Sequence, residues 1–234
     1  MKLIDFHIHP RPNNSYEDMK EYTLNCIEKG IEQIGFLEHG PRISPKRKGR
    51  LTTIENCNSF IERVDRLKME FENIIGIYSG VELDFSTELK FVKWNEDLIF
   101  NSNFDFITGS VHGKYTKDYQ IYIQSNIEMA KNWPVDIIGH LHIPQNYAEW
   151  TDYYRDLFGI CVENNKLIEI NTRVDRVWTE DIINFIVEMA SEYPDLRFIT
   201  GSDAHKSSAV GDGIAQFFAN DYELSVSIPE MGEE

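Results

Sequence analysis

Hydrophobic positions form two alternating patterns along this chain. Short, nearly continuous apolar runs are typical of strands that are covered on both faces of a sheet. Between them lie longer segments in which apolar residues recur every three or four positions, which is the spacing of one helix face. The expected strands cover residues 2–6, 33–38, 74–83, 104–110, 135–140, 166–171 and 196–202. The alternation predicts about seven βα units, and therefore a parallel sheet or barrel of the α/β class.

Capping signals mark the starts of the first two expected helices. Ser15 followed by Asp18 resembles a capping box, and Gly30 supplies a stop after the apolar positions that follow. Thr52 followed by Glu55 fits the capping-box pattern better and begins a second helix. Further helices are expected near residues 118–132, 150–164, 179–192 and 207–219.

Size and charge narrow the classes of protein that fit. A chain of 234 residues suits a single α/β domain over residues 1–234 better than two small ones. The formal net charge of −16 argues against broad binding to nucleic acid or an anionic membrane, because the overall field repels polyanions. The first residues lack the apolar core of a signal peptide, so we expect a cytoplasmic protein. The widely spaced Cys26, Cys57 and Cys161 indicate buried thiols and no disulfide framework.

Every histidine falls at or just beyond the C-terminal end of an expected strand. In a parallel barrel these strand ends meet on the face that carries the active site. Taken singly, each histidine is well explained as a polar residue near a turn, but their shared placement is what a metal site requires. Glu82 and Asp203 are placed in the same way. The histidines are His7, His9, His39, His112, His140, His142 and His205.

The spacing of His7 and His9 places both side chains on the same side of a strand, where two imidazoles could share one ion. Imidazole and carboxylate ligands without thiolate suit zinc, manganese or iron, and do not choose among them. The candidate ligands are too many for one ion, so we expect two or three divalent metal ions. Because His140 already serves the end of its strand, we expect His142 to orient a ligand or to face the substrate.

Four spaced motifs contain most of these residues: "DFHIHP" at residues 5–10, "EHG" at 38–40, "GSVH" ending at His112 with "GH" ending at His140, and "GSDAH" at 201–205. They resemble the motifs of the PHP (polymerase and histidinol phosphatase) superfamily. Glu82 falls between the second and third motifs, where the family places a bridging carboxylate. The resemblance implies a distorted seven-unit (β/α) barrel, similar to a TIM barrel, with its metal site at the C-terminal ends of the strands.

The resemblance also implies a ligand set for each metal. Asp5 looks like a residue that orients a ligand. The segment "PRPNNSYED" departs from the family, because it lacks the histidine that trinuclear members commonly carry there. The third site would then be weak, completed by water, or filled by a different residue. The implied sets are His7, His9, Glu82 and Asp203 for the first metal, Glu82, His112 and His140 for the second, and His39 and His205 for the third.

Clustered divalent ions generate hydroxide at neutral pH and clamp a phosphoryl group during in-line displacement. We therefore expect a metal-bridging hydroxide to attack phosphorus, with Glu82, Asp203 and His205 as candidate catalytic residues. A protonated histidine or a metal-bound water would assist the leaving alkoxide. The sequence has no G-x-S-x-G elbow, no P-loop and no cysteine beside a histidine that would suggest a protein nucleophile.

Basic residues near the strand ends are candidates for binding phosphate. Arg42, Arg173 and Arg176 could reach a phosphate at the barrel mouth, where a bidentate guanidinium suits the ligand. Arg176 also lies downstream of "EIN", as in histidinol-phosphatase-type members. The alternative of solvated loop arginines stays open for all of them. The stretch "PKRKGR" at residues 45–50 is either a solvated charge run or a mobile lid that attracts an anionic substrate.

These features favour a metal-dependent phosphomonoesterase for a small molecule, with histidinol phosphate as the best single candidate. A second hypothesis directs the same metal site to nucleotides, nucleic-acid ends or phosphotyrosine. A third is an amidohydrolase-like hydrolase of carbon–nitrogen bonds or an inactive metal-binding regulator. Amidohydrolases usually call for a lysine bridge, whereas the bridge here looks like Glu82. We expect neither long nucleic acid nor a membrane as partner, and the sequence leaves a homo-oligomer open.

Overall fold

The structure is a computed structural model that describes residues 3–41, 50–88, 93, 96–98, 100–112, 118–141, 149–173, 179–214, 224 and 226–229. Its strands are β1 (Ile4–Ile8), β2 (Gln33–His39), β3 (Gly76–Asp84), β4 (Phe106–Ser110), β5 (Ile137–Ile138), β6 (Leu167–Asn171) and β7 (Arg197–Gly201). Its helices are α1 (Tyr16–Glu28), α2 (Ile54–Glu70), α4 (Tyr119–Asn132), α5 (Trp150–Glu163) and α6 (Glu180–Glu192), followed by the 3-10 turn η2 (Ser207–Ala209).

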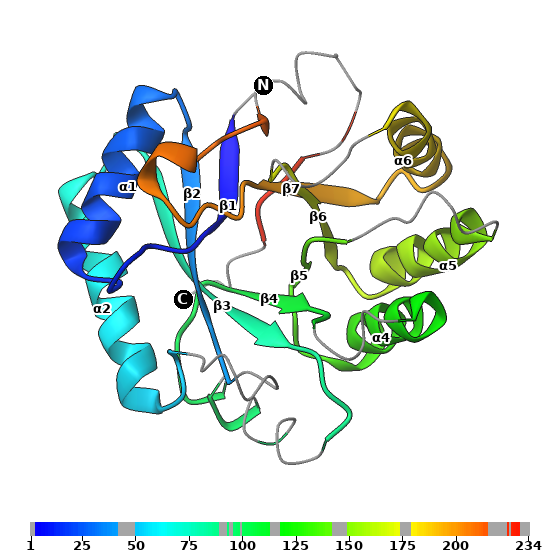
Figure 1. Cartoon of the computed structure of the whole chain (residues 1–234), viewed down its shortest axis with the longest axis horizontal. Coiled ribbons are helices and arrows are strands. Elements are labelled where there is room, and N and C mark those ends of the chain that lie inside the picture. Colours follow the sequence, from blue (N-terminus) through cyan, green and yellow to red (C-terminus); the bar gives the residue numbers. More distant parts are fainter. Residues whose placement is uncertain are drawn as a thin grey trace.

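The strands are all parallel, and each pairs with the next along the chain from β1 to β7. Just beyond β1 and β7 the sheet meets itself. Ile8 bridges Ala204 in parallel, and the His9 amide donates a hydrogen bond to the Ala204 carbonyl over 2.9 Å. Figure 1 shows the strands surrounded by the helices. The expected distorted seven-stranded α/β barrel is confirmed.

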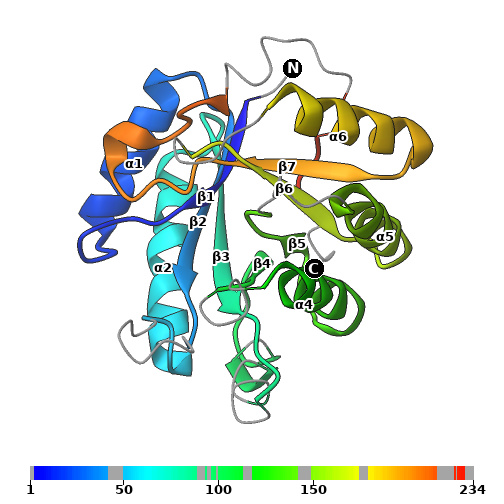
Figure 2. The ribbon, with the colours of Figure 1, turned by 45° about the vertical axis from the view of Figure 1, so that its right-hand side comes forward.

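Three hydrophobic clusters pack this barrel. Two of them lie between sheet and helices, one beneath α1 and α2 and the other beneath α4, α5 and α6 (Figure 2). In the third, the Phe106 ring lies so close to Gly35 that a Cβ there would be 2.6 Å from its Cζ atom. A larger residue would displace the ring. Because side chains fill the interior, a site must form at an end of the barrel. The interior cluster is Ile4, Phe6, Leu37, Phe106, Ile137, Leu167 and Ile199.

The first two helices test the capping predictions. At α1 the capping box is present, with Ser15 Oγ accepting from the Asp18 amide and the Asp18 carboxylate accepting from the Ser15 amide. The prediction of a box at Thr52 is wrong. The cap of α2 is Thr53, whose hydroxyl accepts from the Asn56 amide over 3.2 Å. Thr53 has the extended backbone that a cap requires, at φ −138° and ψ 157°.

Most other elements follow their expected ranges. β5 is shorter than the expected 135–140, because the backbone leaves the extended region and reaches φ 26° at His140. Of the helix expected over 207–219, the structure shows η2, while residues 215–219 lie outside the described part. The three cysteines are buried and free, as expected. Within the described residues, no helix has the length and apolar character needed to cross a membrane.

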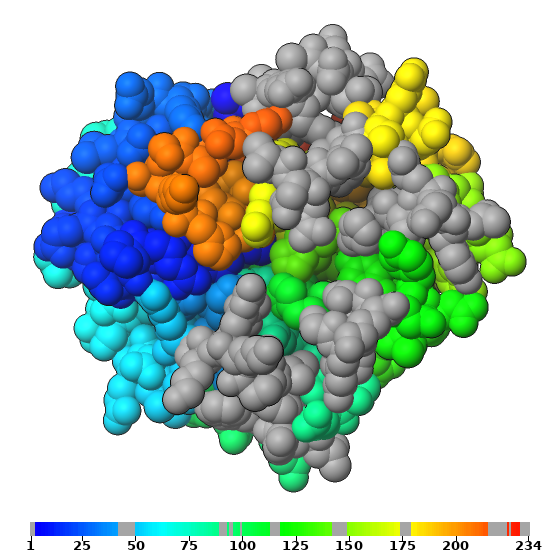
Figure 3. All heavy atoms as spheres, viewed as in Figure 1, coloured from blue at the N-terminus to red at the C-terminus, as the bar shows by residue number. Residues whose placement is uncertain are grey.

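The segment after β7 is tied to α1. Lys29 Nζ donates to the carbonyls of Ser208 over 2.8 Å and Val210 over 2.7 Å, and lies 2.9 Å from Asp212 Oδ1. Figure 3 shows this segment, in orange, lying against α1, in blue. These bonds anchor the chain just beyond the residues that β7 contributes to the site.

Candidate metal centre

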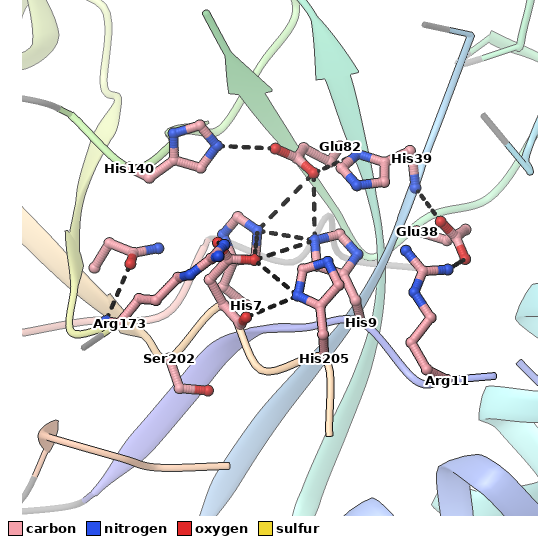
Figure 4. Close-up of polar contacts among 12 residues, drawn as sticks. His7, His9, Arg11, Glu38, His39, Glu82, His140, Arg173, Ser202 and His205 are labelled. Atoms are coloured by element: carbon pink, nitrogen blue, oxygen red, sulfur yellow. Dashed lines mark hydrogen bonds and ion pairs between the residues drawn. The ribbon is translucent and has the colours of Figure 1, made fainter. Parts of the chain in front are cut away.

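The ends of the strands bring histidines and carboxylates from distant parts of the sequence together (Figure 4). Parallel pairing places His39 directly beside Glu82 in the sheet. Most of these side chains are buried, whereas the side chain of His205 is 42% exposed. β1 and the residue after it supply His7 and His9, β2 supplies His39, β3 supplies Glu82, and the segments after β4, β5 and β7 supply His112, His140, Asp203 and His205.

Glu82 lies at the centre and presents its two carboxylate oxygens to different histidines. Oε2 lies 2.6 Å from His39 Nδ1 and 3.3 Å from His9 Nε2. Oε1 lies 3.1 Å from His140 Nε2 and 3.6 Å from His112 Nε2. A carboxylate placed in this way can bridge two cations, with one cation on each oxygen.

The candidate ligand atoms form three groups, each with its atoms within 4.8 Å of one another. The structure brings His7 and His9 together, with their Nε2 atoms 3.1 Å apart and Asp203 Oδ1 3.7 Å from each. The second group contains the same residues as the set implied for the second metal, and the first contains three of the four residues implied for the first metal, without Asp203. The third adds His9 to the two implied histidines. The groups are His7, His9 and Glu82; Glu82, His112 and His140; and His9, His39 and His205.

Unpaired polar atoms indicate what the cluster can hold. Among the described residues, His9 Nδ1, His39 Nδ1 and Glu82 Oε2 are buried without a hydrogen-bond partner. His39 Nδ1 and Glu82 Oε2 lie only 2.6 Å apart, yet not in the geometry of a hydrogen bond. Burying such atoms unpaired costs free energy, which a shared cation would offset. Imidazole nitrogens and carboxylate oxygens therefore fit the expected zinc, manganese or iron.

For Glu82, Asp203 and His9, the electrostatics of the cluster favour the protonation states that bind metal, whereas the carboxylates around His7 favour its protonated form. Burial alone would raise the pKa of Glu82, but the facing histidines, His39 foremost, hold this pKa well below its usual range. Burial also opposes ionisation of Asp203, yet His7 and His9 lower the pKa of Asp203. For His9, burial lowers the pKa well below its usual value. Ionised carboxylates and neutral imidazoles are the forms that bind metal.

Glu169 orients two of the candidate ligands and was not predicted. Its Oε1 lies 2.8 Å from His7 Nδ1, and its Oε2 accepts a hydrogen bond from the His140 amide. Burial alone would lower the pKa of His7, but Glu169 and then Asp203 raise it to about 10. The contact with Nδ1 leaves His7 Nε2 facing Glu82, which is how a carboxylate commonly orients a metal-binding histidine.

The sequence did contain a signal for Glu169. It is a carboxylate in the middle of the apolar run "KLIEIN", and in the folded protein it is 3% exposed. Gly201, on the neighbouring β7, leaves room for it. A Cβ at Gly201 would lie 2.5 Å from the His7 Cβ and closer still to Glu169. Glycine is therefore required there by close packing.

Two more carboxylates support histidines and were not predicted. Asp84 Oδ1 lies 3.0 Å from His112 Nδ1. Glu38 Oε1 accepts from the His39 amide over 2.8 Å, and its Oε2 accepts from Arg11 Nη1 over 2.9 Å. Asp84 ends the stretch "GVELD", which contains Glu82, and Glu38 begins the motif "EHG". The sequence alone did not show which group each carboxylate would contact.

Asp5, which was expected to orient a ligand, bonds mainly to backbone. Oδ1 accepts from the amides of Ser202 over 2.9 Å and His7 over 3.4 Å. Oδ2 accepts from the Ser202 hydroxyl over 2.6 Å and the Gly211 amide over 2.8 Å. Burial raises its pKa. Asp5 thus ties β1 to the segment that carries Asp203.

Two candidate ligands have left-handed backbone conformations. φ is 26° at His140 and 50° at Asp203. Such conformations cost on the order of 1 kcal/mol or more for residues other than glycine, so the surroundings must hold them. The Glu169 carboxylate holds the His140 amide, and Arg173 Nη1 donates to Asp203 Oδ2 over 2.7 Å.

Of the three arginines expected to bind phosphate, Arg173 lies in the part of the chain that the structure describes. Its side chain is 44% exposed, and its bond to Asp203 places it at the edge of the cluster (Figure 4). Outside the described residues lie Arg42, Arg176 and His142, together with residues 45–49 of the basic stretch.

Several known proteins are similar to this chain. The histidinol-phosphatase of Lactococcus lactis subsp. lactis is 25% identical, over 88% of this chain and 85% of that protein. The DNA polymerase/3'-5' exonuclease PolX of Bacillus subtilis is 24% identical, over 89% of this chain but only 35% of its own length. A crystal structure of the Lactococcus lactis histidinol phosphate phosphatase, complexed with zinc, L-histidinol and phosphate, has a TM-score of 0.76 at 20% identity. That structural match covers 99% of this chain and 97% of the other.

A family match covers most of the site. The PHP domain matches residues 5–173, from β1 to just beyond β6, and so includes Glu82. Asp203 and His205 lie beyond this range and join the site where the sheet meets itself. With most of its length matched, this chain belongs to the PHP domain family.

Proposed function

We propose that this protein is a metal-dependent phosphomonoesterase, with histidinol phosphate as the best candidate substrate. The observation that carries the proposal is Glu82, whose two oxygens face two separate groups of histidines. This arrangement suits two adjacent cations. Such ions, when bound, supply a hydroxide nucleophile at neutral pH and neutralise charge on the phosphoryl oxygens.

The chain's own residues would hold the ions and keep them in place. Glu82 and Asp203 would supply the negative charge, while Glu169 and Asp84 orient His7 and His112 through hydrogen bonds to Nδ1. Two or three ions bind, depending on whether the histidines at the solvent-exposed edge of the cluster hold a third ion. The proposed ligands are His7, His9, His39, Glu82, His112, His140, Asp203 and His205.

His205 is better suited to binding a metal than to donating a proton. Burial lowers its pKa, and the positive charge of Arg11 lowers it further against the opposing effect of Asp203. The neutral imidazole is therefore favoured, whereas a general acid must be protonated. We place His205 among the ligands. Protonation of the leaving alkoxide then falls to another group at the site.

The choice of histidinol phosphate is supported by the relatives named histidinol-phosphatase, which align over nearly the whole chain. Arg173, at the edge of the cluster, is in a position to contact an anionic substrate. The similarity to PolX supports nucleic-acid ends as a second candidate. The net charge of −16 disfavours that candidate, because a polyanion is repelled.

The test combines metal content and turnover in protein purified without chelator. Elemental mass spectrometry should find two to three zinc, iron or manganese ions per chain. Phosphate release should be fastest from histidinol phosphate in a panel that includes mononucleotides, phosphotyrosine and phosphodiesters. Both properties should be lost in His9→Ala and Asp203→Ala, because His9 belongs to the first group and Asp203 Oδ1 lies 3.7 Å from both histidines of that group.

Asp195→Ala is the matched control, since Asp195 is exposed near the other end of β7. It should keep both metal and turnover. Fewer than one ion per chain, with no turnover after metal is added back, would contradict the proposal. Faster turnover of another phosphoester would keep the mechanism and replace the substrate.

A further inference from the structure

Arg11 lies in the segment after β1 and is anchored at both its backbone and its side chain. Its amide donates to the Tyr22 hydroxyl over 3.3 Å, and its Nη1 donates to Glu38 Oε2 over 2.9 Å. Glu38 in turn accepts from the amide of His39, a proposed ligand. In Figure 4 the Arg11–Glu38 pair lies beside the histidines, on the opposite side of the cluster from Arg173.

Glu38 does not depend on Arg11 alone for partners. The carboxylate is buried and also accepts hydrogen bonds from Asn14 Nδ2 and the His39 amide. A second guanidinium is near, because Arg50 Nε lies 3.6 Å from Glu38 Oε2. Two guanidinium groups thus face Glu38, and Arg50 also interacts electrostatically with the Asp18 carboxylate. Guanidinium groups close to the cluster can attract an anion locally in a protein that is acidic overall.

The Arg11 guanidinium also has free donors. Within the described part of the chain, its side-chain hydrogen bonding goes to Glu38 alone, through Nη1. The side chain is 23% exposed, so part of it can be reached from solvent. A planar guanidinium suits phosphate oxygens because it can donate two parallel hydrogen bonds. Arg173, by comparison, already pairs with Asp203.

We propose that Arg11, held by Glu38, binds the phosphate group of the substrate at the edge of the metal cluster. The proposal rests on the proposed phosphomonoesterase function. Because its backbone and guanidinium are both anchored, Arg11 loses little conformational freedom when an anion binds. Its contribution should therefore appear in the affinity for phosphate as well as in the KM for the substrate.

The test compares Arg11→Gln and Arg11→Lys with the unchanged protein, all loaded with metal. Isothermal titration calorimetry measures the binding of inorganic phosphate, and steady-state kinetics gives KM and kcat for histidinol phosphate. Arg11→Gln should weaken phosphate binding roughly tenfold to hundredfold, the range expected for losing hydrogen bonds to a charged group. Arg11→Lys keeps the charge but not the planar fork, so its loss should be smaller.

Two controls separate binding from structural support. Arg155→Gln makes the same change on the outer surface, where Arg155 pairs with Glu188 and Glu192, and it should leave phosphate binding unchanged. Adding Arg11→Gln to a Glu38→Gln variant avoids leaving the Glu38 charge without its arginine. The further loss of phosphate affinity in this double variant then belongs to the guanidinium itself.

Two results would overturn the proposal. Phosphate affinity and KM within twofold of the unchanged protein in Arg11→Gln, at full metal content, would mean that Arg11 serves only Glu38. Loss of metal from Arg11→Gln in step with the loss of phosphate binding would mean that Arg11 supports the ligands.

The same data separate this proposal from the proposed function. If the unchanged protein binds phosphate but releases none from any phosphomonoester, the function fails, and the calorimetry still decides the role of Arg11. If the metal-loaded protein binds no phosphate, the assignment of Arg11 fails whatever reaction is catalysed.

Discussion

The two ligand groups that share Glu82 differ from the group of His9, His39 and His205, called here the rim group. His7, His9 and Glu82 are at most 1% exposed, whereas the His205 side chain is 42% exposed. Both groups that share Glu82 contain a carboxylate, whereas the rim group consists of imidazoles that lie beside carboxylates, with His39 Nδ1 2.6 Å from Glu82 Oε2 and His205 Nδ1 3.4 Å from Asp203 Oδ1. The attraction between a cation and an anionic ligand is stronger where water is excluded. One cluster can thus combine sites of high affinity for metal with a site of low affinity.

The difference gives an order of affinities. We expect cations to be held most tightly where Glu82 supplies negative charge, and less tightly at the rim, where Arg11 adds positive charge nearby. The order bears directly on whether two or three ions bind, because residues 10–18, which follow His9, supply no further histidine to the rim group. Three substitutions test it, from the largest expected effect to the smallest.

The largest effect is expected from Glu82→Gln. This change removes the negative charge that the two groups containing Glu82 share, so both should lose their ions. Phosphate release should fall roughly a thousandfold or more, because bound metals contribute several kcal/mol to stabilising the transition state. Metal content and turnover are measured on the same preparation. Glu72→Gln, exposed beyond the other end of the same sheet, should behave as the unchanged protein, and retention of both ions by Glu82→Gln would refute the bridging role.

A smaller effect is expected from Glu169→Gln. The amide keeps the size of the side chain but removes the charge that orients His7 Nδ1. Losing such a supporting contact typically costs about 10- to 100-fold in metal affinity or activity. Competition with a chromophoric chelator measures the affinity, and Glu163→Gln, exposed at the end of α5, serves as the control. Unchanged affinity would show that packing alone orients His7.

The smallest change in metal content is expected from His205→Ala. Because His205 belongs only to the rim group, the variant should differ from the unchanged protein by at most one ion per chain. Stepwise chelation of the unchanged protein should likewise remove a rim ion, where one is bound, before the others. Loss of all ions together in either experiment would show that the groups do not differ in affinity.

Much of the fold could be predicted because its signals are local. Apolar runs predicted each strand, and at β2 and β6 the expected and observed ranges differ by one residue at one end. The signals failed where local alternatives were nearly equal. Thr52 and Thr53 can both cap a helix, and the backbone conformation at Thr53 decided between them. β5 ended early because of the turn at His140, which periodicity does not report.

The sequence predicted many of the residues that belong to the site, but not which of them contact one another. Placement at strand ends drew attention to the histidines, Glu82 and Asp203. Nothing in the sequence showed that Glu169 would contact His7, because 162 residues separate them. Arg11 was not singled out either, since its importance follows from its contact with the buried Glu38. Such pairings arise only when strands from different parts of the chain lie side by side.

The sequence by itself determined a parallel α/β sheet or barrel with histidines at its strand ends, because hydrophobic period and strand-end position are properties of short segments. The resemblance to the PHP superfamily then favoured the barrel. The tertiary structure decided which carboxylate each imidazole faces, how Glu82 divides its oxygens between two groups, and where the Arg11 guanidinium lies. The physical reason is that these interactions act over a few ångströms between residues far apart in the chain. Their geometry is set by the closing of the barrel, in which Asp5 holds Ser202 across the join between β1 and β7.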